Sequence, residues 1–241
     1  YPNVGVCSLD VAAMPGLEAV VDVVYNPNKT ELILRAEEAG VPVAVGGLEM
    51  LVAQAVYAAE YFLGRKFEDA PGEVRRITAA LRRETLNIAL VGMPSCGKST
   101  LGRLLAKQLG RPLVDLDEEI VKADGRSIPD IFAAGGEDAF RARETAALAA
   151  LGKRSGAVLA TGGGCVCREE NYPLLHQNGT ILWLQRDLAR LPKDGRPISQ
   201  RSDLAALYAQ RAPLYARFAD TVIDNNGTPE ETVHKILEVL A

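Results

Sequence analysis

The chain has 241 residues, enough for one large domain or two small ones. With 48% hydrophobic and 24% charged residues it is expected to be globular, and its net charge of −4 argues against a nucleic-acid partner. No apolar run reaches the roughly 18 residues of a membrane span, so no membrane partner is expected. The four cysteines lack the spacing of a zinc site, which indicates a reducing, cytoplasmic location.

The first 64 residues alternate predicted strands and helices. Residues 19–25 (AVVDVVY) predict a buried strand, and residues 41–45 predict a second, shorter one. Thr30 is a suitable cap for a helix between them, and residues 48–63 predict a largely apolar helix that ends at Gly64. Two strands are too few for a stable α/β domain, so this stretch is interpreted as the end of a larger one.

Two segments of this stretch resemble the C-terminal part of shikimate dehydrogenases. They read DVVYNP over residues 22–27 and GGLEMLVAQA over residues 46–55. In that family the matching Tyr and Gln face shikimate and the glycine lies near the nicotinamide, which implies these roles for Tyr25, Gln54 and Gly47. The resemblance covers about residues 1–85, with residues 1–66 as the partial dehydrogenase segment.

The same resemblance also limits what this stretch is expected to do. The catalytic Lys and Asp of that family lie upstream of the matching part, and no G-x-G-x-x-G motif is present. Dehydrogenase activity is therefore not expected from this chain. The resemblance leaves open whether the native gene also encodes an upstream dehydrogenase domain, which would then be a partner of this chain.

Residues 67–85 predict a helix that joins the two halves. Asp69 can cap it, and Val74, Ile77 and Leu81 form an apolar stripe at helical spacing. We interpret it as a helical linker or as the closing helix of the first unit.

Residues 92–100 (GMPSCGKST) contain the spacing G-x-x-x-x-G-K-S. An apolar run precedes them and leucines at helical spacing follow, so the motif lies between a strand and a helix, as a P-loop requires. This predicts ATP bound with Mg²⁺: glycines let backbone N–H groups face phosphate, Lys98 reaches the β- and γ-phosphates, and the Ser99 hydroxyl ligates the ion. The predicted nucleotide-binding residues here are Gly92, Pro94, Ser95, Cys96, Gly97, Lys98, Ser99 and Thr100.

The remaining pattern, residues 86–241, predicts an α/β domain. Strands are expected at residues 86–91, 112–116, 157–160, 180–184 and 221–223, with helices between them. Five such strands favour a P-loop-type, doubly wound parallel sheet, in which ligands bind at the carboxyl ends of the strands. The first unit would be a partial Rossmann-like β-α-β-α segment.

Polar and glycine motifs follow two of these strands. Asp115 and Asp117 form D-x-D, whose carboxylates would point to the same side of a strand end, one toward Mg²⁺ and one toward a substrate hydroxyl. Gly162, Gly163 and Gly164 offer no side chain, so they predict close approach of backbone N–H groups to a ligand.

Three arginines complete the predicted site. Arg141 begins a helical pattern, Arg196 lies in a polar segment (residues 192–202) that has the character of a mobile cover, and Arg211 stands beside a proline turn. Guanidinium groups bind carboxylate or phosphate through two parallel hydrogen bonds, so an anionic small substrate is expected.

Taken together, these motifs resemble the shikimate kinase family from about residue 86 to residue 241. They are GxxxxGKST, DxD, GRSIxDIF, GExxFRxxE, GGG, RP and RAPLY. The resemblance implies transfer of the ATP γ-phosphoryl group to the 3-hydroxyl of shikimate. It implies that Asp117 holds this hydroxyl, that Asp115 orients Mg²⁺ through water and that Arg196 swings in from the lid.

For the rest of the pocket, the resemblance implies that Arg141 and Arg211 bind the substrate carboxylate and that the three glycines line the pocket. In the family an arginine stacks on adenine. Arg190 is the first candidate here and Arg186 the second, because the segment before the lid is shorter than expected.

Two other functions remain open at the level of sequence. One is another small-molecule P-loop kinase, for gluconate or a nucleoside monophosphate, which would share the phosphate loop and a lid. The other is a nucleotide-binding module without turnover, although every proposed catalytic position is filled. A panel of substrates separates the first from a shikimate kinase, and ATP binding without turnover would favour the second.

Overall fold

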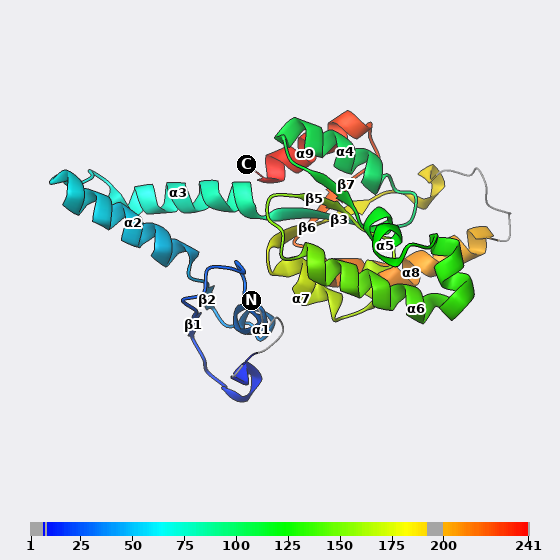
Figure 1. Ribbon diagram of the computed structural model, residues 1–241, viewed down its shortest axis with the longest axis horizontal. Helices are drawn as coiled ribbons and strands as arrows, with labels where there is room; N and C mark the ends of the chain where they lie inside the picture. Colours follow the sequence, from blue (N-terminus) through cyan, green and yellow to red (C-terminus); the bar gives the residue numbers. More distant parts are fainter. Residues whose placement is uncertain (1–6, 8, 192–199, 241) are drawn as a thin grey trace. The chain divides into compact units, whose positions relative to one another are not determined.

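The computed structural model describes residues 7, 9–191 and 200–240. The chain divides into two compact units (Figure 1). The first comprises residues 1–86 together with residues 176–178, and the second comprises residues 87–175 and 179–241. Each unit is considered by itself below.

The described residues of the first unit form two short strands and three α-helices. Its elements are η1 (Val11–Ala13), β1 (Ala19–Val21), α1 (Glu31–Glu38), β2 (Val43–Val45), α2 (Leu48–Leu63) and α3 (Ala70–Thr85). The strands β1 and β2 pair in parallel and form a two-stranded sheet. As predicted, the Thr30 hydroxyl caps α1 by accepting from the Ile33 N–H, and Gly64 ends α2 in a left-handed conformation.

The prediction of a buried strand over residues 19–25 is wrong. Regular pairing covers only residues 19–21, and the side chain of Val21 is 71% exposed. Parallel strands are normally covered on both faces, and the described residues supply no such cover for Val21 or Val23. Apolar composition predicted the strand, but burial depends on neighbours that the described residues of this unit do not provide.

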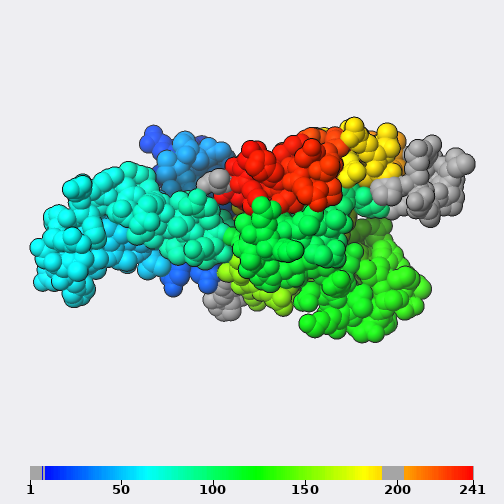
Figure 2. Space-filling view, turned by 90° about the horizontal axis from the view of Figure 1, so that it is seen from above, coloured from blue at the N-terminus to red at the C-terminus, as the bar shows by residue number. Residues whose placement is uncertain are grey.

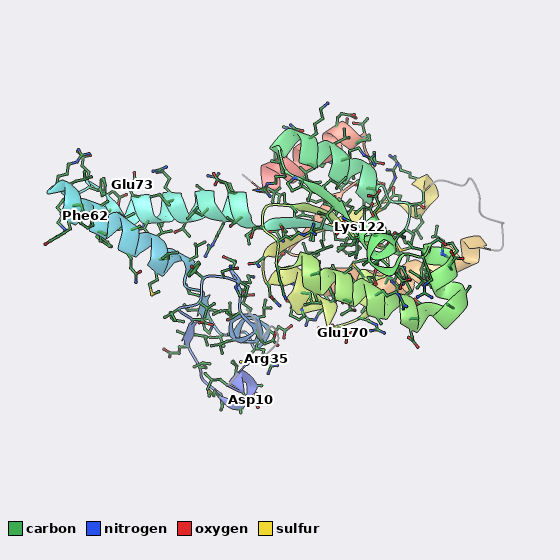
Figure 3. The ribbon with its side chains drawn as sticks, viewed as in Figure 1. Asp10, Arg35, Phe62, Glu73, Lys122 and Glu170 are labelled. Atoms are coloured by element: carbon green, nitrogen blue, oxygen red, sulfur yellow. The ribbon has the colours of Figure 1, made fainter. Side chains whose placement is uncertain are left out.

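The helices α2 and α3 form a hairpin with its own small core. Val52 and Val56 of α2 pack against Val74 of α3, and Ile77 and Leu81 of the predicted stripe lie partly buried beside them. Phe62 and Glu73, labelled in Figure 3, lie at the end of the hairpin where the chain turns from α2 to α3. The segment predicted as a helical linker therefore packs against the helix that precedes it.

The second unit is an α/β domain of five strands. Its elements, in chain order, are β3 (Asn87–Val91), α4 (Lys98–Leu109), β4 (Leu113–Asp115), α5 (Leu116–Asp124), α6 (Ile128–Leu151), β5 (Val158–Ala160), η2 (Cys165–Cys167), α7 (Asn171–His176), β6 (Gly179–Gln185), η3 (Leu188–Arg190), α8 (Gln200–Phe218), β7 (Thr221–Asp224) and α9 (Pro229–Leu240).

The sheet has the strand order β4-β5-β3-β6-β7, and every pair is parallel. All five residues of the central strand β3 are buried. Figure 1 shows α4 and α9 on one face of the sheet and α6, α7 and α8 on the other, and Figure 2 shows α9 lying along α4. The predicted doubly wound parallel sheet is confirmed, and its carboxyl edge carries the loops after β3, β4 and β5.

Local sequence signals set the helix ends. Ser127 caps α6 through the Asp130 N–H, and Thr228 and Glu231 form the reciprocal capping box of α9. Residues 128–151 form α6, but the backbone is non-helical at Gly136, where φ is 69°, so α6 consists of two helical segments that meet at a kink. Among the described residues, no helix is long and apolar enough to cross a membrane.

Candidate active site

The phosphate loop lies between β3 and α4, as its sequence context predicted. Gly97 has φ 100° and immediately precedes α4, so its backbone turns the chain into the helix in a conformation that other residues rarely adopt. At Gly92 a Cβ atom would lie 2.7 Å from the Leu184 carbonyl oxygen, so glycine is required there too. The loop thus directs backbone N–H groups and the N-terminus of α4 to one place, which suits a phosphate.

Lys98 is held inside this loop. Its side chain is 8% exposed, and Nζ donates to the carbonyl oxygens of Gly92 and Met93 at 2.9 and 3.0 Å. Two hydrogen bonds to carbonyl oxygens fix the direction of this ammonium group. Lys98 therefore provides a positive charge at a fixed place in the phosphate loop.

Ser99 and Asp115 place two oxygen atoms that could bind a cation close together beside the phosphate loop. The Ser99 hydroxyl donates to Oδ2 of Asp115 at 2.7 Å, although the two residues lie on α4 and at the end of β4. The other oxygen of Asp115 accepts from the Asp117 N–H at 3.1 Å and caps α5. The cap fixes this carboxylate, so its second oxygen remains directed at Ser99.

Asp117 lies in the first turn of α5, whereas the sequence predicted a strand end. Its pKa is raised above the ordinary value, first by burial and then by the nearby charge of Asp115, while Lys98 and Arg141 oppose the rise. Its Oδ1 atom is buried and has no hydrogen-bond partner among the described residues. A buried carboxylate oxygen without a partner is a candidate acceptor for a substrate hydroxyl.

Arg141 is fixed by two carboxylates of its own helix. Its Nη1 atom donates to Glu144 at 2.8 Å, and its Nη2 atom donates to Glu137 at 3.0 Å. Glu144 is completely buried, and burial raises its pKa, while the charge of Arg141 acts in the opposite direction. The sequence placed Glu144 in the motif GExxFRxxE but assigned it no role.

The triple-glycine loop closes the site from the side of β5. A Cβ atom at Gly162 would lie 2.7 Å from Oε1 of Glu144, and one at Gly163 would lie 2.8 Å from Pro94. At Gly164 a Cβ atom would lie 2.1 Å from Nη2 of Arg141. The three glycines therefore pack closely against the phosphate loop and the buried ion pair, and their predicted approach to a ligand stays a prediction.

Helix α8 supplies two groups to this loop. Nη1 of Arg211 donates to the Gly163 carbonyl oxygen at 3.2 Å, and the Tyr215 hydroxyl donates to the same oxygen at 2.5 Å. Tyr215 is completely buried and stacks on Trp183. Sequence reasoning assigned a role to Arg211 but missed Tyr215, although the motif RAPLY contains both residues.

A pocket of about 480 Å³ opens beside Arg141. Seven residues line it: Gly135, Gly136, Glu137, Asp138, Arg141, Cys167 and Arg168. Two arginines and two acidic residues are among them, so the lining is polar and carries charges of both signs.

The two candidates for an adenine partner lie in different surroundings. Nη1 of Arg190 donates to the Asn226 carbonyl oxygen, and the Arg190 side chain is 57% exposed. The Nε atom of Arg186 is buried with no hydrogen-bond partner among the described residues. Arg196 and most of the predicted cover lie outside the described residues.

Comparison with known proteins shows the family of the chain. The family model described as "SKI: Shikimate kinase" matches residues 94–241. A shikimate kinase of Parasynechococcus marenigrum is 44% identical over 164 residues, which cover 64% of this chain and 85% of the relative. One of Pseudomonas syringae pv. tomato is 43% identical over 164 residues, 64% of this chain and 94% of the relative.

Solved structures of shikimate kinases are also similar to this chain. The shikimate kinase from Acinetobacter baumannii in complex with shikimate has a TM-score of 0.62 and 35% sequence identity, and the match covers 67% of this chain and 96% of that one. The enzyme from Aquifex aeolicus has a TM-score of 0.58 and 34% identity over 64% of this chain and 96% of that one.

Proposed function

Because the chain belongs to the shikimate kinase family, it phosphorylates shikimate, and we propose that it transfers the γ-phosphoryl group of ATP to the 3-hydroxyl. The products are shikimate 3-phosphate and ADP, in the biosynthesis of aromatic amino acids. The observation that carries this proposal is the proximity of two cationic side chains, Lys98 and Arg141, to the buried carboxyl group of Asp117.

The phosphate loop binds the nucleotide. Backbone N–H groups of residues 92–100 and the N-terminus of α4 face the phosphates. Lys98 exchanges its bonds to Gly92 and Met93 for bonds to phosphate oxygens, because a charged acceptor gives the stronger bond. Its charge neutralises the negative charge that develops during transfer.

Ser99 and Asp115 fit a Mg²⁺ ion. A hydroxyl and a carboxylate oxygen lie 2.7 Å apart beside the loop, and Mg²⁺ commonly takes one or two protein oxygens together with phosphates and water. When bound, the ion supplies charge neutralisation at the phosphate oxygens. Ser99 would ligate the ion directly, and Asp115 would hold it through water.

Asp117 and the arginines position shikimate. Oδ1 of Asp117, which has no hydrogen-bond partner in the described part of the chain, accepts a hydrogen bond from the reacting hydroxyl and helps to remove its proton. Its raised pKa makes it a better base than an exposed aspartate, provided that it is ionised at the working pH. Arg141 and Arg211 bind the substrate carboxylate, and the N–H groups of residues 162–164 line the pocket between them.

An arginine at adenine and an arginine at the transferred phosphoryl group complete the proposal on the nucleotide side. Arg190 stacks on adenine, supported by its place beside Asn226, and Arg186 is the second candidate. Arg196, outside the described residues, reaches the transferred phosphoryl group from the cover. Closure of this cover excludes water, so ATP hydrolysis without shikimate is expected to be much slower than transfer.

The decisive experiment measures ADP release from ATP and Mg²⁺ with and without shikimate. Release that depends on shikimate and is lost in Asp117→Asn supports the transfer and its site. Gluconate and nucleoside monophosphates serve as alternative acceptors in the same assay. No stimulation by shikimate in folded protein that binds ATP would overturn the proposal.

We also propose that residues 1–85 are a C-terminal fragment of a shikimate dehydrogenase, with an upstream dehydrogenase domain in the native gene. The resemblance of residues 22–27 and 46–55 supports this. So does Gly47, where a Cβ atom would lie 2.0 Å from the Val23 carbonyl oxygen, so that only glycine fits. Tyr25 and Gln54 are exposed. If this chain oxidised shikimate with NADP⁺, the interpretation of residues 1–85 as a fragment without dehydrogenase activity would be wrong.

A further inference from the structure

Asn225 joins the end of the sheet to the phosphate loop. It follows β7, is 1% exposed, and its Nδ2 atom donates to the Cys96 carbonyl oxygen at 2.6 Å. The two residues are 129 positions apart in the chain. The buried side-chain amide therefore makes a short hydrogen bond to a loop that is distant in the sequence.

The orientation of this amide is set from its other side. The Thr232 hydroxyl of α9 is completely buried and donates to Oδ1 of Asn225 at 3.0 Å. The Cys96 carbonyl has no hydrogen to give, so the amide nitrogen must face it and the amide oxygen must face the hydroxyl. The backbone N–H of Asn225 donates to the Gln185 carbonyl oxygen at 2.8 Å, which fixes the main chain as well.

The carbonyl that Asn225 holds belongs to the peptide between Cys96 and Gly97. In a trans peptide the C=O and N–H bonds point in opposite directions. Binding the carbonyl on the side of β7 therefore turns the Gly97 N–H away from β7. In a phosphate loop this N–H and those that follow it are the donors to the nucleotide.

We propose that Asn225 is a positioning residue that orients the Cys96–Gly97 peptide for the nucleotide phosphates. This inference rests on the proposed function, in which residues 92–100 bind ATP. The neighbouring Asn226 accepts at Oδ1 from the Asp187 N–H at 2.9 Å, and its carbonyl oxygen accepts from Arg190. One short segment thus connects the phosphate loop with the residues proposed to lie at adenine.

The test is Asn225→Asp, which keeps the shape but replaces the NH₂ donor by an acceptor that faces the Cys96 carbonyl. We expect the Kd for ATP to rise about 10-fold or more, because a buried hydrogen bond becomes a repulsion. The KM for shikimate should stay within about two-fold, since nucleotide binding is the step that changes. On acidification the new carboxyl group becomes a donor again, so the Kd for ATP should recover in this variant relative to the parent chain.

Asn171→Asp is the matched control. Asn171 is completely buried, and its Nδ2 atom donates to the Cys165 carbonyl oxygen at 2.7 Å, so the same change breaks an equivalent bond elsewhere in the domain. Its Kd for ATP should remain within about two-fold of the parent value. An equal loss of ATP affinity in both variants would mean general loosening of the domain and would overturn the proposal.

Thr232→Val provides a second route if Asn225→Asp does not fold. It removes the hydroxyl that orients the amide and leaves a side chain of similar shape, so the Kd for ATP should rise by about 3-fold. Unchanged ATP affinity in Asn225→Asp, or in Thr232→Val where only that variant folds, rejects the role of Asn225. A parent chain that binds no ATP would instead reject the proposed function.

Discussion

The Tyr215 hydroxyl donates a hydrogen bond to the Gly163 carbonyl oxygen across 2.5 Å. The same oxygen accepts from Arg211, so two groups of α8 fix the peptide between Gly163 and Gly164. The N–H of this peptide points away from α8, because the peptide is trans. Burial raises the pKa of Tyr215 far above its ordinary value, so the hydroxyl stays protonated and remains a donor at every working pH.

Removal of this hydroxyl should weaken shikimate binding more than ATP binding. In Tyr215→Phe the buried ring remains, so the fold should persist, but the Gly163 carbonyl loses its short bond. We expect the KM for shikimate to rise about 5- to 10-fold while the KM for ATP changes little. Tyr208→Phe, on the same helix but with its hydroxyl bonded to Gln185, is the control and should leave both constants unchanged.

Asp117→Asn should lower turnover by about 100-fold or more, since the amide cannot take the proton of the hydroxyl. Substrate binding should weaken less, because the amide oxygen still accepts a hydrogen bond. Steady-state kinetics with ATP and shikimate varied separately measure both effects. Turnover close to that of the parent chain would remove Asp117 from the proposed mechanism.

The same substitution should raise stability near neutral pH. The folded protein holds the proton of Asp117 more tightly than the unfolded chain, whose pKa is near 3.8, so stability falls as pH rises from that value through the folded pKa. Asn carries no charge and avoids this cost. We expect Asp117→Asn to raise Tm by about 1–3 °C at neutral pH, with the difference shrinking in acid below the ordinary pKa of aspartate. Thermal unfolding across a pH series measures it.

The main parts of this site could be predicted because each is a local pattern. The loop with Lys98, the pair Asp115 and Asp117, and the three glycines lie at strand ends in a parallel sheet, which brings them to one edge. Tyr215 and Asn225 could not be found this way. Their roles depend on contacts with residues 52 and 129 positions away, and no local spacing encodes such contacts.

The fold shows the same division between features set by local sequence and features set by distant contacts. Helix caps such as Ser127 and Thr228 are satisfied within four residues, so the sequence predicts them well. The prediction of a buried strand at residues 19–25 failed because burial depends on what packs against the strand.

Glu144→Gln should weaken shikimate binding through Arg141. The buried carboxylate holds the guanidinium at 2.8 Å, and a neutral amide leaves the positive charge less well paired and less well directed. We expect the KM for shikimate to rise about 10-fold with a smaller change in kcat. Glu137→Gln is the matched control: it removes the other partner of Arg141, but that carboxylate is 62% exposed, so its effect should stay within about two-fold. Equal effects of the two changes would contradict the special role of the buried pair.

Gly164→Ala tests whether the triple-glycine loop and Arg141 act as one unit. The new methyl group would lie 2.1 Å from Nη2 of Arg141, so the guanidinium must move. A long side chain can move at little cost to folding, but here the movement breaks its bonds to Glu144 and Glu137. We expect Tm to fall by about 2–4 °C and the KM for shikimate to rise about 10-fold or more, while the KM for ATP stays close to the parent value. If both KM values rise together, the methyl group disturbs the phosphate loop through the Gly163–Pro94 contact, and the loop serves the nucleotide as much as the substrate.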